Sequence, residues 1–206
     1  MNLRTLNVRK ATFQTTGHAA RAWARPWWEQ IDLPYPDRTE RRRVLDEWLH
    51  ALHQIWAAPD HPLGGEHIDR APITVAATGP RAMRIAARYA DVWEASFCTI
   101  ARFRDLATRF DELAGHRHPR VPRSLEIDAI TGPTAGARQR LTTRFLAERG
   151  PDGPAALAKA LTGSAHQIAE RLAAYHDAGV DQLLIATVDP HDQATLEALA
   201  TAATLC

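Results

Sequence analysis

Cysteine and long apolar runs are both scarce in this 206-residue chain, and each scarcity excludes a class of protein. Cys98 and Cys206 are the only cysteines, and they are too few and too far apart in sequence to form a disulfide framework. No apolar run approaches the roughly 18 residues that a membrane-spanning helix needs. The first ten residues also lack the apolar segment of a signal peptide. We therefore expect a cytoplasmic protein with no membrane partner.

Neither sign of charge is in excess. The 25 basic and 24 acidic residues give a formal net charge of +1, so the composition gives no reason to expect a nucleic-acid partner. All but two of the basic residues are arginine, a bias typical of GC-rich coding sequence. At 45% hydrophobic residues, the chain can form the core of one large domain or of two small ones.

The most informative stretch is Ile73–Phe97, which reads as strand, tight turn, helix and strand. An apolar run over Ile73–Ala77 is broken by Thr78-Gly79-Pro80. Pro80 suits the first position of a helix, with Thr78 or Gly79 as N-cap, and apolar residues then recur at helical spacing as far as Tyr89. A helix N-terminus at the carboxyl end of a strand attracts phosphate. An ordinary capped turn between strand and helix would have the same pattern, so spacing alone leaves both interpretations open.

The rest of the chain alternates helical and strand patterns. Residues 1–38 form an irregular arm, and residues 39–206 form the domain. An alternation of this kind predicts a parallel sheet, either open or part of a (β/α) barrel. The other predicted helices are Glu40–Ala57 (capped by Thr39), Ala101–Ala114, Ala135–Arg149, Ser164–Ala178 and a last one after Pro190; the other predicted strands are Ser124–Thr131 and Gln182–Val188.

Glu126 and Asp128 lie two residues apart on one face of their predicted strand. Two carboxylates so placed could carry out acid–base chemistry. Paired carboxylates on a strand are more often exposed to solvent or bonded to arginine, and we favour that interpretation.

Two histidine pairs and one cysteine are weaker candidates. His116 and His118 could ligate a metal, but they lie in a basic loop with no third ligand in view. His50 and His53 have helical spacing but lack the glutamate of a zinc-binding helix motif. Cys98 has no recognisable base beside it, so we expect a small buried residue there.

Three segments occur in an order that resembles the bacterial-luciferase-like monooxygenase family, a group of flavin- and deazaflavin-dependent (β/α)8 barrels. The first runs from Arg38 to Trp56 and is followed by Gly65-Glu66-His67. The second, Pro72–Trp93, is similar to the family's P-I-W-I-G-G-S-G-P…A-D-G-W pattern. The third, Leu161–Leu184, is similar to its G-T-P-E-E-V-A-E-R-L…A-G-V-D pattern.

The resemblance implies an α/β fold that forms the C-terminal half of a TIM barrel, with about four parallel βα units. It also implies a flavin- or deazaflavin-dependent oxidoreductase acting on a small-molecule substrate, with FMN or the deazaflavin coenzyme F-420 as cofactor. The residues that it places at the cofactor are Ala76, Ala77, Thr78, Gly79 and Pro80, around the phosphate, and Trp93, on the cofactor side of its strand.

Residues 1–38 show no counterpart of the family's first three strands, so we expect an N-terminally shortened member with low activity on its own. No catalytic residue can be carried over. Two alternatives stay open: a non-catalytic remnant that serves as a binding or assembly module, and an open α/β protein that binds another phosphorylated ligand. A half-barrel has open strand edges, which predicts a homodimer or a partner that supplies the missing half.

Overall fold

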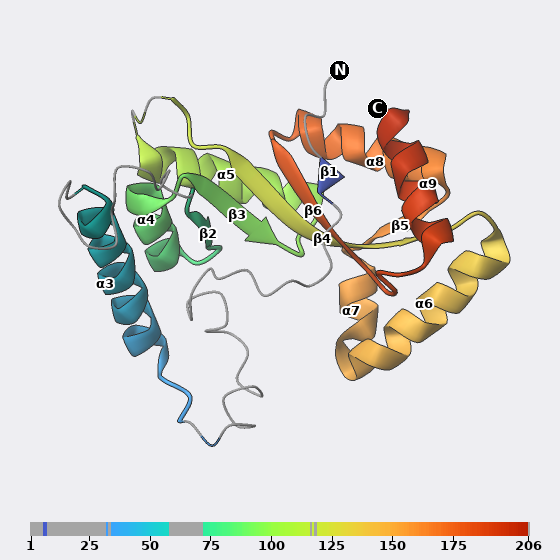
Figure 1. The fold of residues 1–206 in the computed structure, drawn as a ribbon, viewed down its shortest axis with the longest axis horizontal. Helices are drawn as coiled ribbons and strands as arrows, with labels where there is room; N and C mark the ends of the chain where they lie inside the picture. Colours follow the sequence, from blue (N-terminus) through green and yellow to red (C-terminus); the bar gives the residue numbers. More distant parts are fainter. Residues whose placement is uncertain are drawn as a thin grey trace. The chain divides into compact units, whose positions relative to one another are not determined.

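In the computed structural model of the chain, the described residues are 6–7, 32, 34–57, 72–115, 117 and 119–205 (Figure 1). The chain divides into two compact units that interleave in sequence. Unit 1 comprises Met1–Thr12, Glu94–Arg109 and Pro122–Cys206, and unit 2 comprises Phe13–Trp93 and Phe110–Val121. The predicted boundary between an arm and a domain at residue 38 stays a prediction, because most of the arm lies outside the described residues.

Unit 1 contains a sheet in which β4 is the central strand. The short strand β1 pairs with β6, and β6 pairs with β4, both in parallel. The register of β4 and β6 runs from Ser124 opposite Gln182 to Ala129 opposite Thr187. The last residues of β4 pair in parallel with β5, and β3 is the other neighbour of β4. The bounds of these strands are Leu6–Asn7 (β1), Val92–Ser96 (β3), Arg123–Thr131 (β4), Leu161–Gly163 (β5) and Gln182–Thr187 (β6).

The helices of unit 1 bury the apolar side chains that alternate along the strands. Leu125 and Ile127 of β4 are fully buried, as are Ile168 and Leu172 on α8. α8 packs against α9 and β5, and α6 packs against β4 (Figure 1). The helices and their bounds are α5 (Ile100–Ala114, which extends into unit 2), α6 (Ala135–Arg149), the 3-10 turn η1 (Gly150–Asp152), α7 (Gly153–Leu157), α8 (Ala165–Asp177) and α9 (Gln193–Thr204).

Unit 2 contains α3 (Arg38–Ala57), β2 (Thr74–Ala76), α4 (Pro80–Tyr89) and the start of β3. α3 packs against α4, where the His53 and Tyr89 rings lie 5.3 Å apart between centroids. The Asp91 carboxylate accepts a hydrogen bond from the backbone N–H of Ile73 at 2.8 Å. This bond ties the entry to β2 to the entry to β3.

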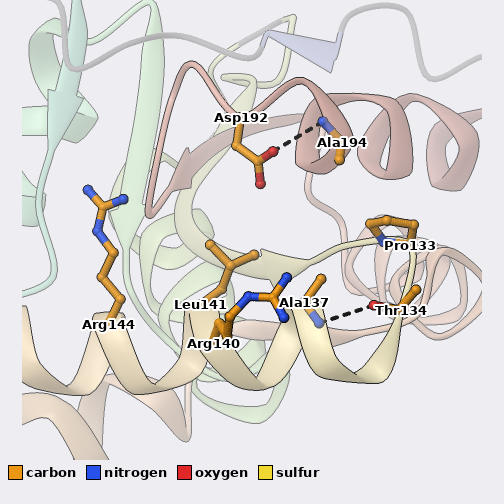
Figure 2. Close-up of a pocket in the computed structure, with 8 residues that line it drawn as sticks. All are labelled: Pro133, Thr134, Ala137, Arg140, Leu141, Arg144, Asp192 and Ala194. Atoms are coloured by element: carbon orange, nitrogen blue, oxygen red, sulfur yellow. Dashed lines mark hydrogen bonds between the residues drawn. The ribbon is translucent and has the colours of Figure 1, made fainter.

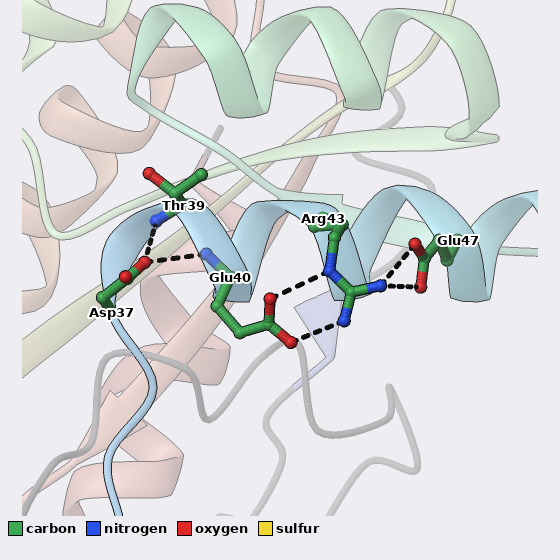
Figure 3. Close-up of polar contacts among 5 residues, drawn as sticks. All are labelled: Asp37, Thr39, Glu40, Arg43 and Glu47. Atoms are coloured by element: carbon green, nitrogen blue, oxygen red, sulfur yellow. Dashed lines mark hydrogen bonds and ion pairs between the residues drawn. The ribbon is translucent and has the colours of Figure 1, made fainter.

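The N-terminus of α3 differs from the sequence expectation. Asp37, not Thr39, is the capping residue, because its carboxylate accepts the N–H groups of both Thr39 and Glu40 (Figure 3). Farther along the same face, the Arg43 guanidinium bonds Glu40 and Glu47, one helical turn away on either side. All three side chains are well exposed, so these pairs contribute little to stability.

Most predicted elements are present with small shifts at their ends. The predicted capping box that opens α8 is confirmed, since Ser164 and Gln167 bond each other's backbone N–H groups. Gly179 follows α8 with the predicted positive φ, +92°. Sequence periodicity missed β5 and α7, which are too short to show a repeat.

Candidate functional site

The predicted phosphate turn joins β2 to α4 in unit 2. β2 ends at Ala76, and Gly79 is the N-cap of α4 with extended backbone (φ −93°, ψ 147°). No side chain caps this helix, and Pro80 occupies its first turn. The first hydrogen bond inside the helix runs from the Met83 N–H to the Gly79 carbonyl, 2.9 Å. The N–H groups of Arg81 and Ala82 therefore lack acceptors inside the helix, as the first N–H groups of any α-helix do.

The residues that begin α4 are open to solvent. Thr78, Gly79 and Pro80 are exposed, whereas Ala77 is buried beneath them. A Cβ placed on Gly79 would meet no atom within 4 Å. An anion can thus approach the helix N-terminus, where its charge is favoured by the helix dipole. The residues present fit a cofactor phosphate.

Trp93 supports this turn from within the core. Its side chain is completely buried, and its indole N–H donates to the Ala77 carbonyl at 2.8 Å. The ring stacks on Phe110, with 4.7 Å between centroids and 10° between planes. A side chain so enclosed cannot itself touch a ligand, but its hydrogen bond fixes the backbone just before Thr78.

A second group of polar residues lies in unit 1, on one face of β3 and β4. It consists of Glu94 and Ser96 from β3 and of Ser124, Glu126 and Asp128 from β4. Both Ser96 and Ser124 donate to Glu94, at 3.5 and 3.2 Å. We weighed Glu126 and Asp128 from the sequence alone but missed Glu94. The sequence does show that Glu94 alternates with Trp93 and Ala95, which are buried. It does not show that β3 pairs with β4.

Burial shifts all three carboxyl groups toward their protonated forms. It raises the pKa of Glu126 from 4.5 to about 7, and the neighbouring charges of Glu94 and Asp128 add to the effect while Arg149 opposes it. Burial also raises the pKa of Glu94, against the hydrogen bonds from Ser124 and Ser96. The pKa of Asp128 is raised by burial in spite of Arg149.

Arg149, at the end of α6, reaches this group. Its Nη2 donates to both carboxylate oxygens of Asp128, at 2.8 and 3.0 Å. The guanidinium carbon lies 5.8 Å from the ring centroid of Phe97 and 5.1 Å from that of Phe145, within cation–π range. For Asp128 the favoured interpretation, a carboxylate bonded to arginine, is confirmed. Glu126 is half-buried, and its carboxyl group makes no hydrogen bond within the described part of the chain.

A pocket of about 420 Å³ also lies in unit 1, between α6 and the first turn of α9 (Figure 2). Thr134 and Asp192 line it, but their side chains already cap the two helices by accepting the N–H groups of Ala137 and Ala194. Arg144, also in its lining, is paired with Glu148 and Asp189. None of the predicted cofactor residues lines this pocket.

The weaker candidates gain no support. His53 bonds the Leu49 carbonyl and His50 bonds Gln54, while His116 and His118 lie outside the described residues. Cys98 is buried as expected, and burial raises the pKa of its thiol to about 11. Over the described ranges, no group of histidine, cysteine and acidic side chains could hold a metal ion. The described helices include none that is both long enough and apolar enough to cross a membrane.

Comparison with known proteins identifies the family. The model of the luciferase-like monooxygenase family matches residues 26–182. The chain belongs to this family. The matched residues include the whole β2–α4 turn and the strands β3 and β4, which carry the second group of polar residues. No curated protein sequence matches the chain significantly.

Solved structures show the same fold at low sequence identity. An F-420-dependent secondary alcohol dehydrogenase in complex with an F-420–acetone adduct is 13% identical, with a TM-score of 0.62 over 82% of this chain and 64% of that one. Apo-MsnO8 is 18% identical, with a TM-score of 0.64 over 88% and 65%. The EDTA monooxygenase EmoA from Chelativorans sp. BNC1 is 14% identical, with a TM-score of 0.62 over 86% and 62%.

The chain spans just under two thirds of the length of these structures. The predicted fold class, an α/β fold comprising part of a TIM barrel, is confirmed by the parallel strand pairs and by this likeness.

Proposed function

We propose that the protein is an oxidoreductase that uses a flavin or deazaflavin and binds the cofactor phosphate at the turn Ala76–Pro80. The observation that carries the proposal is the uncapped N-terminus of α4, open in front of Gly79, in a chain of the luciferase-like monooxygenase family. One fold relative is described as a complex with an F-420–acetone adduct. FMN and F-420 both carry a phosphate that this turn could hold.

The chain's own residues would hold and orient the cofactor. Backbone N–H groups of Arg81 and Ala82 would donate to the phosphate, and the helix dipole would favour its charge. Trp93 would act as a positioning residue through its bond to the Ala77 carbonyl. The bound cofactor would supply hydride transfer or oxygen chemistry, while the protein provides orientation and exclusion of water.

Replacing Gly79 with aspartate tests the phosphate site, because the change acts on binding and on stability in opposite directions. An aspartate at the N-cap would accept the N–H groups of Arg81 and Ala82 and place a negative charge where the phosphate would lie. We expect affinity for FMN or F-420, followed by quenching of cofactor fluorescence, to fall at least about tenfold. The free energy of unfolding should stay unchanged or rise by a few tenths of a kcal/mol.

Gly79→Asn is the matched control, since asparagine caps the helix as well as aspartate but carries no charge. It should weaken binding less than Gly79→Asp does. If wild-type protein quenches neither cofactor up to millimolar concentration, the chain is a binding or assembly module without a cofactor pocket. If Gly79→Asp binds as tightly as wild type, the phosphate lies elsewhere.

We also propose that the working form contains a second chain, either another copy or a partner that supplies more of the barrel. Trp48, on α3, is 56% exposed, an unusual amount for a large aromatic side chain. Sedimentation velocity at several concentrations should show a dimer at tens of micromolar. Trp48→Glu should shift it to monomer if α3 forms the interface, and should leave it unchanged if strand edges do. A wild-type monomer at every concentration would contradict self-association.

A further inference from the structure

The guanidinium of Arg149 uses only part of its hydrogen-bonding capacity. Nη2 bonds Asp128, whereas Nε and Nη1 have no hydrogen-bond partner among the residues that the structure describes. Glu126 lies two residues before Asp128 on the same face of β4, and its carboxyl oxygens likewise accept no hydrogen bond there. An arginine with unused donors is thus bonded to Asp128, two residues from a carboxyl group with unused acceptors, and its charge acts on that group.

Arg149 also lies at the end of a helix in unit 1, where the backbone can follow its side chain. It is the last residue of α6, and the backbone changes at Gly150 to the 3-10 turn η1. The guanidinium rests on Phe97, whose N–H donates to the Glu126 carbonyl at 2.7 Å. Its side chain remains 42% exposed, so it has room to move.

We propose that Arg149 is a pH-responsive clamp: it bonds Asp128 alone while Glu126 is protonated, and it bridges Asp128 and Glu126 once Glu126 ionises. Ionised Glu126 would face Glu94 across the β3–β4 pair and Asp128 along β4, and both carboxyl groups repel it. Arg149 is the cation that opposes this repulsion. Five N–H donors in a planar fork allow one guanidinium to serve two carboxylates.

The described side chains on the same face of β3 and β4 as Glu126 bring two carboxyl groups and two hydroxyl groups. From β3 come Glu94 and Ser96, and from β4 come Ser124 and Asp128. On β6, Leu184 lies opposite Glu126 in the strand register, and Ala186 lies opposite Asp128. Burial, with the charges of Glu94 and Asp128, raises the pKa of Glu126 to about 7. The end of α6 would follow the guanidinium toward β4.

The test is an NMR titration of the cofactor-free protein between pH 6 and 8, so its outcome is independent of the proposed function. The carboxyl carbon of Glu126 and the Nε–Hε signal of Arg149 should shift with one common midpoint near pH 7. Arg144, paired with exposed Glu148 on the same helix, is the internal control, and its signal should stay flat.

Two variants separate the clamp from a general pH effect. In Glu126→Gln the Arg149 signal should no longer move across this range. In Glu94→Gln, which keeps Glu126 and removes one repelling charge, the common midpoint should fall by about half a pH unit or more. An Arg149 signal that moves equally in Glu126→Gln would overturn the proposal. So would one that stays still in the wild type while Glu126 titrates, because Arg149 would then be fixed on Asp128.

Discussion

Replacing Trp93 with alanine should lower the free energy of unfolding by about 3–5 kcal/mol, the usual cost of emptying a large aromatic site in a core. The indole is fully buried, stacks on Phe110 and donates to the Ala77 carbonyl. Alanine would leave a cavity against Phe110 and a buried carbonyl without this donor. Urea denaturation at pH 7 measures the change, and the expected loss is a large fraction of the roughly 5–15 kcal/mol by which a typical native protein is stable.

Trp93→Phe separates the two contributions. Phenylalanine keeps most of the stack but has no N–H, so we expect a loss of about 1–3 kcal/mol, from the unsatisfied Ala77 carbonyl and the smaller ring. Leu113→Ala on α5 is the control, because that side chain is 38% exposed and should cost about 1 kcal/mol or less. Equal losses for Trp93→Phe and Leu113→Ala would show that the indole N–H does not hold the turn.

Trp93→Phe also links the fold to the proposed function. If the indole N–H fixes the turn, cofactor binding should weaken in this variant even where the protein remains folded, because the donors of Arg81 and Ala82 would lose their orientation. A turn that Trp93 does not position would give unchanged cofactor affinity in the folded fraction.

The turn was predictable from sequence because its determinants are local. Gly79 and Pro80 mark a helix start by their backbone properties, and apolar residues at helical spacing follow directly. Trp93 was predicted near the cofactor through the family pattern alone. The hydrogen bond from its indole to Ala77 inside the core depends on how β2, β3 and α5 pack together. No short-range sequence pattern encodes that packing.

The group of polar residues on β3 and β4 was only partly predictable, because its members come from two strands that are distant in sequence. Alternation along β4 placed Glu126 and Asp128 on one face, but it could not show that Glu94 lies across from them. Nor could it show that Arg149, twenty-one residues beyond Asp128, returns to bond it. Asp37 was missed as a cap for a different reason: Thr39 is also a good N-cap residue, and only the backbone decides between two candidates two residues apart.

Glu126→Gln should make the protein more stable at pH 8, by up to about 3 kcal/mol, and should change its stability little at pH 4. Folding raises the pKa of Glu126 from 4.5 to about 7, so between these values the folded state binds more protons than the unfolded state. Stability contributed by this group is fully present below pH 4.5 and is lost as the pH rises through 7. About 1.4 kcal/mol for each tenfold change in proton affinity sets the upper limit, and solvent screening of this half-buried side chain makes the expected change smaller.

Urea denaturation of wild type and variant at pH 4, 6 and 8 tests this expectation, with the difference between the two proteins taken at each pH. Glu94 and Asp128 are present in both proteins, so the difference removes their titration except for the part that depends on the charge of Glu126. Glu148→Gln is the control, because that carboxylate is exposed and pairs with Arg144 on the surface of α6, where a loss of a few tenths of a kcal/mol is expected at pH 6 and 8. A stabilisation by Glu126→Gln that is the same at pH 4 and pH 8 would mean that glutamine packs better than glutamate, and that the buried charge is not its cause.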